Sequence, residues 1–158
     1  MKYTKARLRI CVTLLVLVLL FIWGNSCLPA PVSAAFSRWV RNLLAPLFGW
    51  PPSVPGATGS GVLRKVAHLT EFCWLGLCLG WLFGMVRTKK TEIYLYPLLA
   101  GIAAACIDET IQIFVPGRGP GIADVGIDTL GVTLGIVFIS LIQHIKKNKS
   151  KYLEENKL

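Results

Sequence analysis

The chain has 158 residues, of which 54% are apolar and 16% are charged, and its formal net charge is +9. Soluble globular domains carry about 25% charged residues, so this chain has too few polar side chains to cover its own surface. This composition argues against a cytosolic enzyme, a secreted disulfide-rich domain and a disordered tail. Together with long apolar runs, it indicates a single membrane domain over residues 1–158.

Four stretches are each long and apolar enough to cross the hydrocarbon core of a membrane as a helix. They cover about residues 10–28, 62–86, 93–115 and 122–145. The first stretch could instead be a cleaved signal peptide, because basic residues precede it, but it is long and lacks a clear small-residue cleavage site. We therefore expect an all-α membrane protein with a four-helix transmembrane bundle.

Residues 29–61 form a loop between the first two stretches, and its middle has the pattern of an amphipathic helix. Apolar side chains recur there at helical spacing, at Phe36, Trp39, Val40, Leu43, Leu44 and Leu47. We expect Pro46 to end this helix and residues 50–61 to have no regular structure. The helix could lie on the outer leaflet or pack over the bundle as a lid, and the sequence leaves both alternatives open.

The basic residues lie mainly on one side of the expected membrane segments. Twelve of the 17 Lys and Arg residues fall in the N-terminal segment, in the short loop after residue 86 and in the C-terminal tail. The positive-inside rule places this side and both termini in the cytoplasm, and the loop at residues 29–61 outside. Because this side accounts for the whole net charge, we expect contacts with anionic membrane lipids rather than with nucleic acid.

Ionisable side chains inside membrane segments are costly, and here they gather at one depth near the outer side. The second segment carries Lys65, His68 and Glu71, the third carries Asp108, Glu109 and Gln112, and the fourth carries Asp124 and Asp128. Their spacing of three or four residues puts those of each segment on one helix face. We therefore expect a shared polar cavity at the outer face, built by three helices, with Arg118 in a tight loop beside it.

Small residues at four-residue intervals predict close packing between the same three helices. They are Gly76, Gly80 and Gly84 in the second segment, Gly101 and Ala105 in the third, and Gly131 and Gly135 in the fourth. The last two continue the stripe of Asp124 and Asp128, so we expect these acids to point into the bundle.

The polar residues also carry a resemblance to a known family. Their pattern is Lys65-x-x-His68-x-x-Glu71-Phe72, Asp108-Glu109-x-x-Gln112, Pro116-Gly117-Arg118, and Asp124-Val125 followed by Asp128-x-x-Gly131. This pattern closely resembles that of the VanZ-like family, which consists of small bacterial membrane proteins associated with teicoplanin resistance. The resemblance covers roughly residues 62–145. It implies a location in the bacterial cytoplasmic membrane and a link to glycopeptide sensitivity, but it implies no agreed reaction.

Four kinds of function are compatible with this polar cluster. As an enzyme, His68, Glu71, Asp108, Glu109 and Asp124 are candidate catalytic residues, through a divalent ion or through proton transfer. As a binding protein, the chain would hold a lipid-linked cell-wall precursor, a lipid headgroup or a glycopeptide, with Lys65, Gln112, Arg118 and Asp128 as candidate ligand contacts. As a structural network, the charges would pair Lys65 with Glu71 or Asp108, and Arg118 with Asp124. A transporter or proton path is the fourth alternative.

Overall fold

The structure is a computed structural model that describes residues 4–49, 51, 61–119 and 121–156, without the side chain of Lys151. Within these residues the chain is all-helical, with no strand. The helices are α1 (Lys5–Ser26), α2 (Ala30–Phe48), α3 (Gly61–Val86), α4 (Lys90–Ile113) and α5 (Ile122–Glu155). Because α1, α3, α4 and α5 are each long and apolar enough to cross a membrane, the predicted four-span plan is confirmed.

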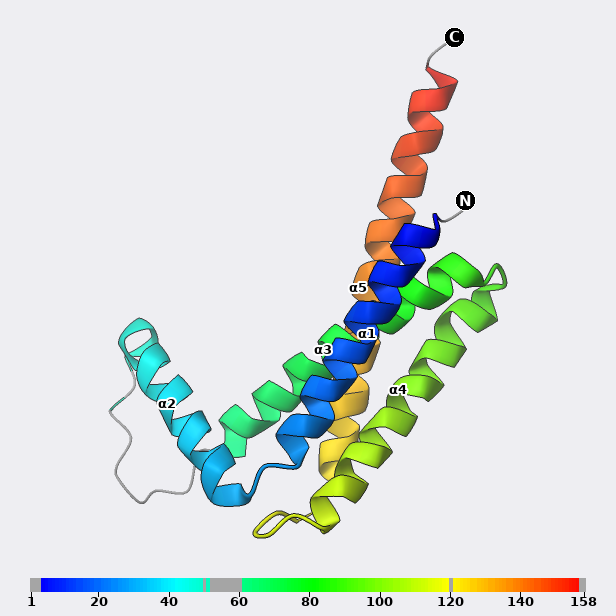
Figure 1. The fold of residues 1–158 in the computed structure, drawn as a ribbon. Helices are drawn as coiled ribbons and strands as arrows, with labels where there is room; N and C mark the ends of the chain where they lie inside the picture. The colour runs from blue at the N-terminus through cyan, green and yellow to red at the C-terminus, as the bar shows by residue number, and fades with distance from the viewer. Residues whose placement is uncertain (1–3, 50, 52–60, 120, 157–158) are drawn as a thin grey trace.

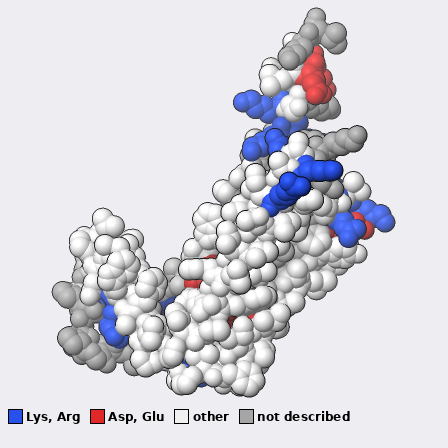
Figure 2. Space-filling model, in the orientation of Figure 1, with Lys and Arg blue, Asp and Glu red and all other residues white. Residues whose placement is uncertain are grey.

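Helices α1, α3, α4 and α5 form the bundle, and α2 extends away from it (Figure 1). The core consists of apolar side chains from all four bundle helices: Ile22, Phe72, Leu75, Leu79, Ala104, Ala105, Val132 and Ile136. Both termini lie at one end of the bundle. On the face shown in Figure 2, Lys and Arg side chains gather at that end, while the body of the bundle is almost free of charge.

The predicted boundaries hold closely for α3, whereas α5 continues to Glu155, well beyond the expected end at residue 145. Its last turns carry Lys146, Lys147 and Lys149. The long apolar stretch ends at Ile145, before these lysines, so the additional turns are too basic to belong to the membrane-spanning part.

The prediction that Pro46 ends the helix in the loop is wrong. Helix α2 continues to Phe48, with Pro46 inside it, and it ends at Gly49, whose φ of 64° is in the left-handed region that favours glycine. The helix also begins earlier than the apolar pattern indicated, at Ala30, because Pro31 is well placed in a first helical turn. The expectation of irregular structure at residues 50–61 falls almost entirely outside the described residues.

The exposed face of α2 helps to decide whether this helix lies on the membrane surface or packs over the bundle as a lid. Phe36, Trp39, Leu43 and Leu47 are each at least 60% exposed, and α2 extends away from the bundle with only a small contact to α3 (Figure 1). An amphipathic helix with its apolar side uncovered favours the membrane-surface alternative over the lid.

The most extensive helix contact in the molecule is between α3 and α5. A Cβ atom at Gly76 would collide with the backbone of Val132, and one at Gly135 would collide with the carbonyl of Cys73. At Gly131 the obstacle is the carbonyl oxygen of Leu69, 2.5 Å away. The predicted small-residue stripe is therefore confirmed as a place where two helix backbones touch.

This contact predicts different results for two glycines of the same helix. In Gly135→Ala the new methyl group meets the rigid backbone of α3, so α3 and α5 must separate. We expect a loss of about 1–3 kcal/mol in the free energy of unfolding, measured as thermal unfolding in detergent. Gly126→Ala is the control, because its Cβ would have no neighbour within 4 Å. An equal loss in both variants would contradict the close approach.

Candidate functional site

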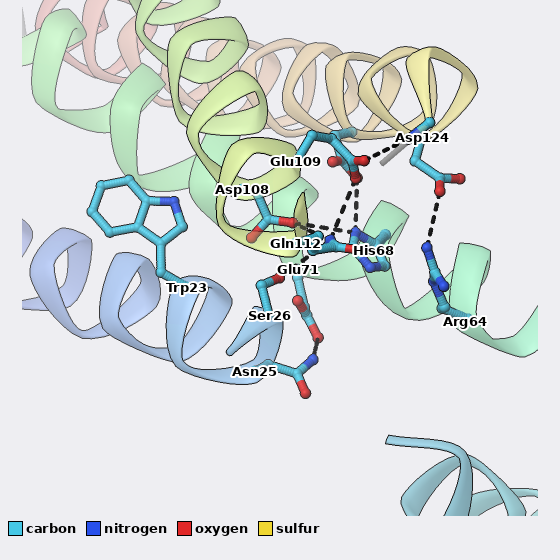
Figure 3. A network of polar contacts seen from close by, with 12 residues as sticks. Trp23, Asn25, Ser26, Arg64, His68, Glu71, Asp108, Glu109, Gln112 and Asp124 are labelled. Carbon is cyan, nitrogen blue, oxygen red and sulfur yellow. Dashed lines mark hydrogen bonds and ion pairs between the residues drawn. The ribbon is translucent and has the colours of Figure 1, made fainter. Parts of the chain in front are cut away.

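The predicted polar residues come together at the end of the bundle opposite the two termini (Figure 3). The first turns of α3 and α5 and the last turns of α1 and α4 meet there. Asp108, Gln112 and Asp128 are fully buried, and His68 and Glu109 are nearly so, at 5% and 6% exposure. The convergence of three helices expected from the sequence is therefore found, but these five side chains pack together and do not line an open cavity.

His68 lies at the centre of this cluster, between one carboxylate from α4 and one from α5. Its Nδ1 atom lies 3.3 Å from Oδ1 of Asp128 and 4.0 Å from Oδ2 of Asp108. Neither acid has a Lys or Arg partner among the described residues. One imidazole carries at most one positive charge, so two ionised carboxylates would leave one negative charge uncompensated in a buried position.

Gln112 is the main hydrogen-bond donor inside the cluster. Its Nε2 atom donates to Oδ2 of Asp108 at 2.9 Å, and it lies 3.4 Å from both Oε1 of Glu109 and Oγ of Ser26. An amide has only two N–H groups to share among these three acceptors. The role expected for Gln112 as a ligand contact is untested. In this structure its side chain orients the two acids of its own helix.

The end of α1 also contributes to the site, which the sequence analysis did not anticipate. Asn25 donates to Oε1 of Glu71 at 2.9 Å, and Trp23 donates to the carbonyl of Ala104 at 3.4 Å. With Ser26, these residues tie α1 to both α3 and α4. The signal available in the sequence was the polar pair Asn25-Ser26 at the outer end of an otherwise apolar segment.

The loop between α4 and α5 closes over the cluster through Glu109. Its Oε2 atom accepts a hydrogen bond from the backbone N–H of Gly121 at 2.7 Å. This bond fixes the start of α5 against the end of α4, because Gly121 is the residue just before the first turn of α5. Glu109 therefore has two donors, Gly121 and Gln112.

Arg118 extends from the same loop to α1. Its Nε and Nη2 atoms donate to the carbonyl oxygens of Leu28 and Asn25 at 3.0 and 3.1 Å. Carbonyls at the end of a helix lack partners within the helix, and a guanidinium group satisfies them well. Burial lowers the pKa of Arg118 from its ordinary value, and the positive charge of Arg64 lowers it further.

Asp124 is paired with Arg64 rather than with Arg118, so the predicted ion pair between Arg118 and Asp124 is wrong. The Nη2 atom of Arg64 lies 3.0 Å from Oδ2 of Asp124, and the two side chains are 35% and 17% exposed. Lys65 is exposed and has no ion pair among the described residues, so its expected pairing with Glu71 or Asp108 is also wrong. Arg64, one turn before His68, was overlooked as a site residue.

The site thus has two parts. The inner cluster, formed by His68, Asp108, Glu109, Gln112 and Asp128, is buried. The outer rim, formed by Arg64, Lys65, Glu71, Arg118 and Asp124, is exposed or partly exposed. This arrangement allows a charged group from outside to meet the rim first, with the inner cluster directly behind it.

Several buried atoms of the inner cluster have no hydrogen-bond partner among the described residues. They are Nδ1 of His68, Oδ1 of Asp108, Oε1 of Gln112 and both carboxylate oxygens of Asp128. Such atoms are rare in buried positions, because each loses its bonds to water on burial. Among the described residues, one group could hold a metal ion, and it consists of His68, Asp108 and Asp128. One possible ligand atom from each of the three lies within 4.8 Å of the other two.

A cavity of about 280 Å³ lies between α1, α3 and α4, next to this site. It is lined by apolar side chains, among them Leu15, Leu75 and Ala104, and Trp23 lies at its border. The cavity found here is therefore apolar. A hydrocarbon chain would fit its chemistry.

Comparison with protein families matches the chain to the family described as VanZ/LLP1, over residues 11–143. The match covers most of α1 and all of α2, α3 and α4 and extends into α5, so it contains every residue of the inner cluster and the outer rim. No curated protein and no solved structure matches the chain.

Asp128 lacks a hydrogen-bond donor among the described residues, whereas Glu109 accepts from Gly121, so substitutions at the two acids should change stability differently. Asp128 adds a second carboxylate beside one imidazole, so Asp128→Asn removes like-charge repulsion while keeping the side-chain shape. We expect its melting temperature in detergent with EDTA to equal or exceed that of the wild type. Glu109→Ala removes the acceptor of Gly121 N–H, and we expect a loss of about 1–3 kcal/mol. A loss of about 3–5 kcal/mol in Asp128→Asn would instead identify a structural ion pair.

Proposed function

The chain belongs to the VanZ/LLP1 family and is a multi-span membrane protein, and we propose that it binds the phosphate-bearing headgroup of an envelope lipid or lipid-linked cell-wall precursor. The end of the bundle that carries the site would face the outside of a bacterial cytoplasmic membrane, with both termini in the cytoplasm. The concentration of basic residues at the opposite end supports this orientation.

The observation that carries the proposal is the outer rim in front of a buried acid–imidazole cluster. Arg64 and Lys65 are accessible cations on α3, and they lie one turn from His68. A guanidinium group and an ammonium group on neighbouring residues are well suited to hold phosphate oxygens. Arg64 pairs with Asp124, whereas Lys65 has no ion-pair partner among the described residues.

The apolar cavity favours a lipid over a free phosphate as the ligand. Its lining includes Ile107, which directly precedes Asp108 in α4, and Ala104, one turn earlier. A lipid with its headgroup at the outer rim would place a hydrocarbon chain along the bundle at this level. Burial of apolar surface contributes about 25 cal/mol per Å², so even a short chain segment adds affinity.

Catalysis on the same headgroup is a second candidate function. The specific observation that favours it is the imidazole of His68 within 4.0 Å of two carboxylates. A His beside acids is the usual arrangement for general acid–base catalysis. Recovery of the bound lipid supports binding alone, whereas a chemically altered product that disappears in His68→Gln supports catalysis.

Headgroup binding is tested with variants of the rim. Lys65→Gln removes an exposed cation that has no described ion pair, so folding should be unaffected. We expect at least fivefold weaker binding of phosphatidylglycerol and of a polyprenyl diphosphate, measured by native mass spectrometry of the purified protein. Lys147→Gln, at the other end of the bundle, is the charge-matched control, and diacylglycerol is the phosphate-free control lipid. Equal binding of all three lipids would contradict the proposal.

The link to glycopeptides is tested in cells. We propose that the protein lowers sensitivity to teicoplanin by holding a cell-wall precursor at the outer rim. Expression of the wild type in a susceptible Gram-positive host should then raise the minimum inhibitory concentration at least fourfold, and Lys65→Gln should abolish this increase at an equal protein level. An unchanged inhibitory concentration with wild-type protein in the membrane would refute the link to resistance while leaving headgroup binding in place.

A further inference from the structure

We infer that His68, Asp108 and Asp128 form a binding site for one divalent transition-metal ion, with Zn²⁺ as the preferred ion and Mn²⁺ as the second choice. The site follows from the geometry of the inner cluster and does not depend on lipid binding. Only its role toward a headgroup rests on the proposed function.

The distances within the cluster fit a shared ion. Nδ1 of His68 and Oδ1 of Asp128 are 3.3 Å apart, and Oδ2 of Asp108 lies 4.0 Å from the same nitrogen. Ligand atoms bound to one ion at about 2.1 Å are separated by about 3.0–3.5 Å. His68 and Asp128 already have this separation, and Asp108 needs only a small side-chain movement to reach it.

The unpartnered atoms are an independent observation that points to a ligand. Asp108 and Asp128 are both fully buried, yet among the described residues three of their four carboxylate oxygens have no hydrogen-bond partner. Within the same residues, Nδ1 of His68 has no hydrogen-bond partner either, although it lies within ion-pair distance of both acids. These buried polar atoms have lost their bonds to water without a full set of partners in return, and a bound cation would supply the missing partner.

The balance of charge indicates a cation. Two carboxylates face one imidazole, and among the described residues the nearby guanidinium groups are used elsewhere: Arg64 by Asp124, and Arg118 by backbone carbonyls. A divalent ion would neutralise both acids with His68 in its neutral form, which is the form that coordinates metals. This removes the charge deficit that the protein alone leaves.

The donor set decides the kind of metal. Imidazole nitrogen favours Zn²⁺ and other transition metals, whereas Mg²⁺ and Ca²⁺ prefer oxygen ligands alone. Gln112 holds Asp108 through its amide, as residues behind a metal ligand commonly do. Three protein ligands also leave an open coordination position. If the proposed function holds, a phosphate oxygen of the bound headgroup would occupy this position.

The test uses the full-length protein in detergent, with any affinity tag removed and metal stripped by EDTA. After dialysis against Zn²⁺ or Mn²⁺ with excess Mg²⁺, elemental analysis should give close to one bound ion per chain. We expect Asp128→Asn and Asp108→Asn to weaken binding at least tenfold. Asp124→Asn is the matched control, because Asp124 lies on the same helix as Asp128 but pairs with Arg64, and it should retain the ion.

Two results would overturn the site: no stoichiometric Zn²⁺ or Mn²⁺ in the wild type, or equal binding in the wild type and a folded Asp128→Asn variant. X-ray absorption spectroscopy of the loaded wild type makes the test independent of variant folding. It should show one imidazole nitrogen with oxygen ligands, and a sulfur ligand would refute the assignment. Loss of headgroup binding with the ion still bound refutes only the proposed function, and headgroup binding without an ion refutes only the metal site.

Discussion

The structure depends on one constraint, which is that ionisable groups placed inside a membrane bundle must be satisfied without water. Asp108 and Asp128 are fully buried and face a single imidazole. Neutral groups around the site meet this constraint only in part. Asn25 of α1 donates to Glu71, Gln112 of α4 donates to Asp108, and the N–H of Gly121 donates to Glu109. Among the described residues no such donor reaches Asp128, which lies 3.3 Å from Nδ1 of His68.

The glycines of α5 determine how closely these charges approach. Gly131 lies against the carbonyl of Leu69, the residue next to His68, and Asp128 is less than one turn before Gly131. A larger residue at Gly131 would push α5 away from α3 and so lengthen the 3.3 Å separation between Asp128 and His68. Helix packing and site geometry are thus one feature: the backbone contact that stabilises the bundle also sets the separation of the charged atoms.

Much of this arrangement is predictable from the sequence. Apolar length identifies the four spans, and the helical spacing of His68, Asp108 and Asp128 correctly predicts that three helices converge on one polar cluster. The specific partners are less predictable. Asp124 has two arginines within reach of its helix end, and only the tertiary structure shows that Arg64 reaches it while Arg118 turns to the end of α1. The extent of α2 was also missed, because Pro46 costs the helix one backbone hydrogen bond but does not prevent Leu47 and Phe48 from keeping the helical conformation after it.

The alternative functions make different demands on the inner cluster and on the outer rim. A binding protein needs only the rim, where Lys65 is exposed and has no ion-pair partner among the described residues. A structural network would need the inner acids to be satisfied, and the unpartnered oxygens of Asp128 argue against it. A proton path would need polar groups along the bundle, yet the core between this site and the basic end consists of residues such as Phe72, Leu79 and Ile136. An ion held by the inner cluster would join the two parts, because it satisfies the buried acids while presenting positive charge toward the rim.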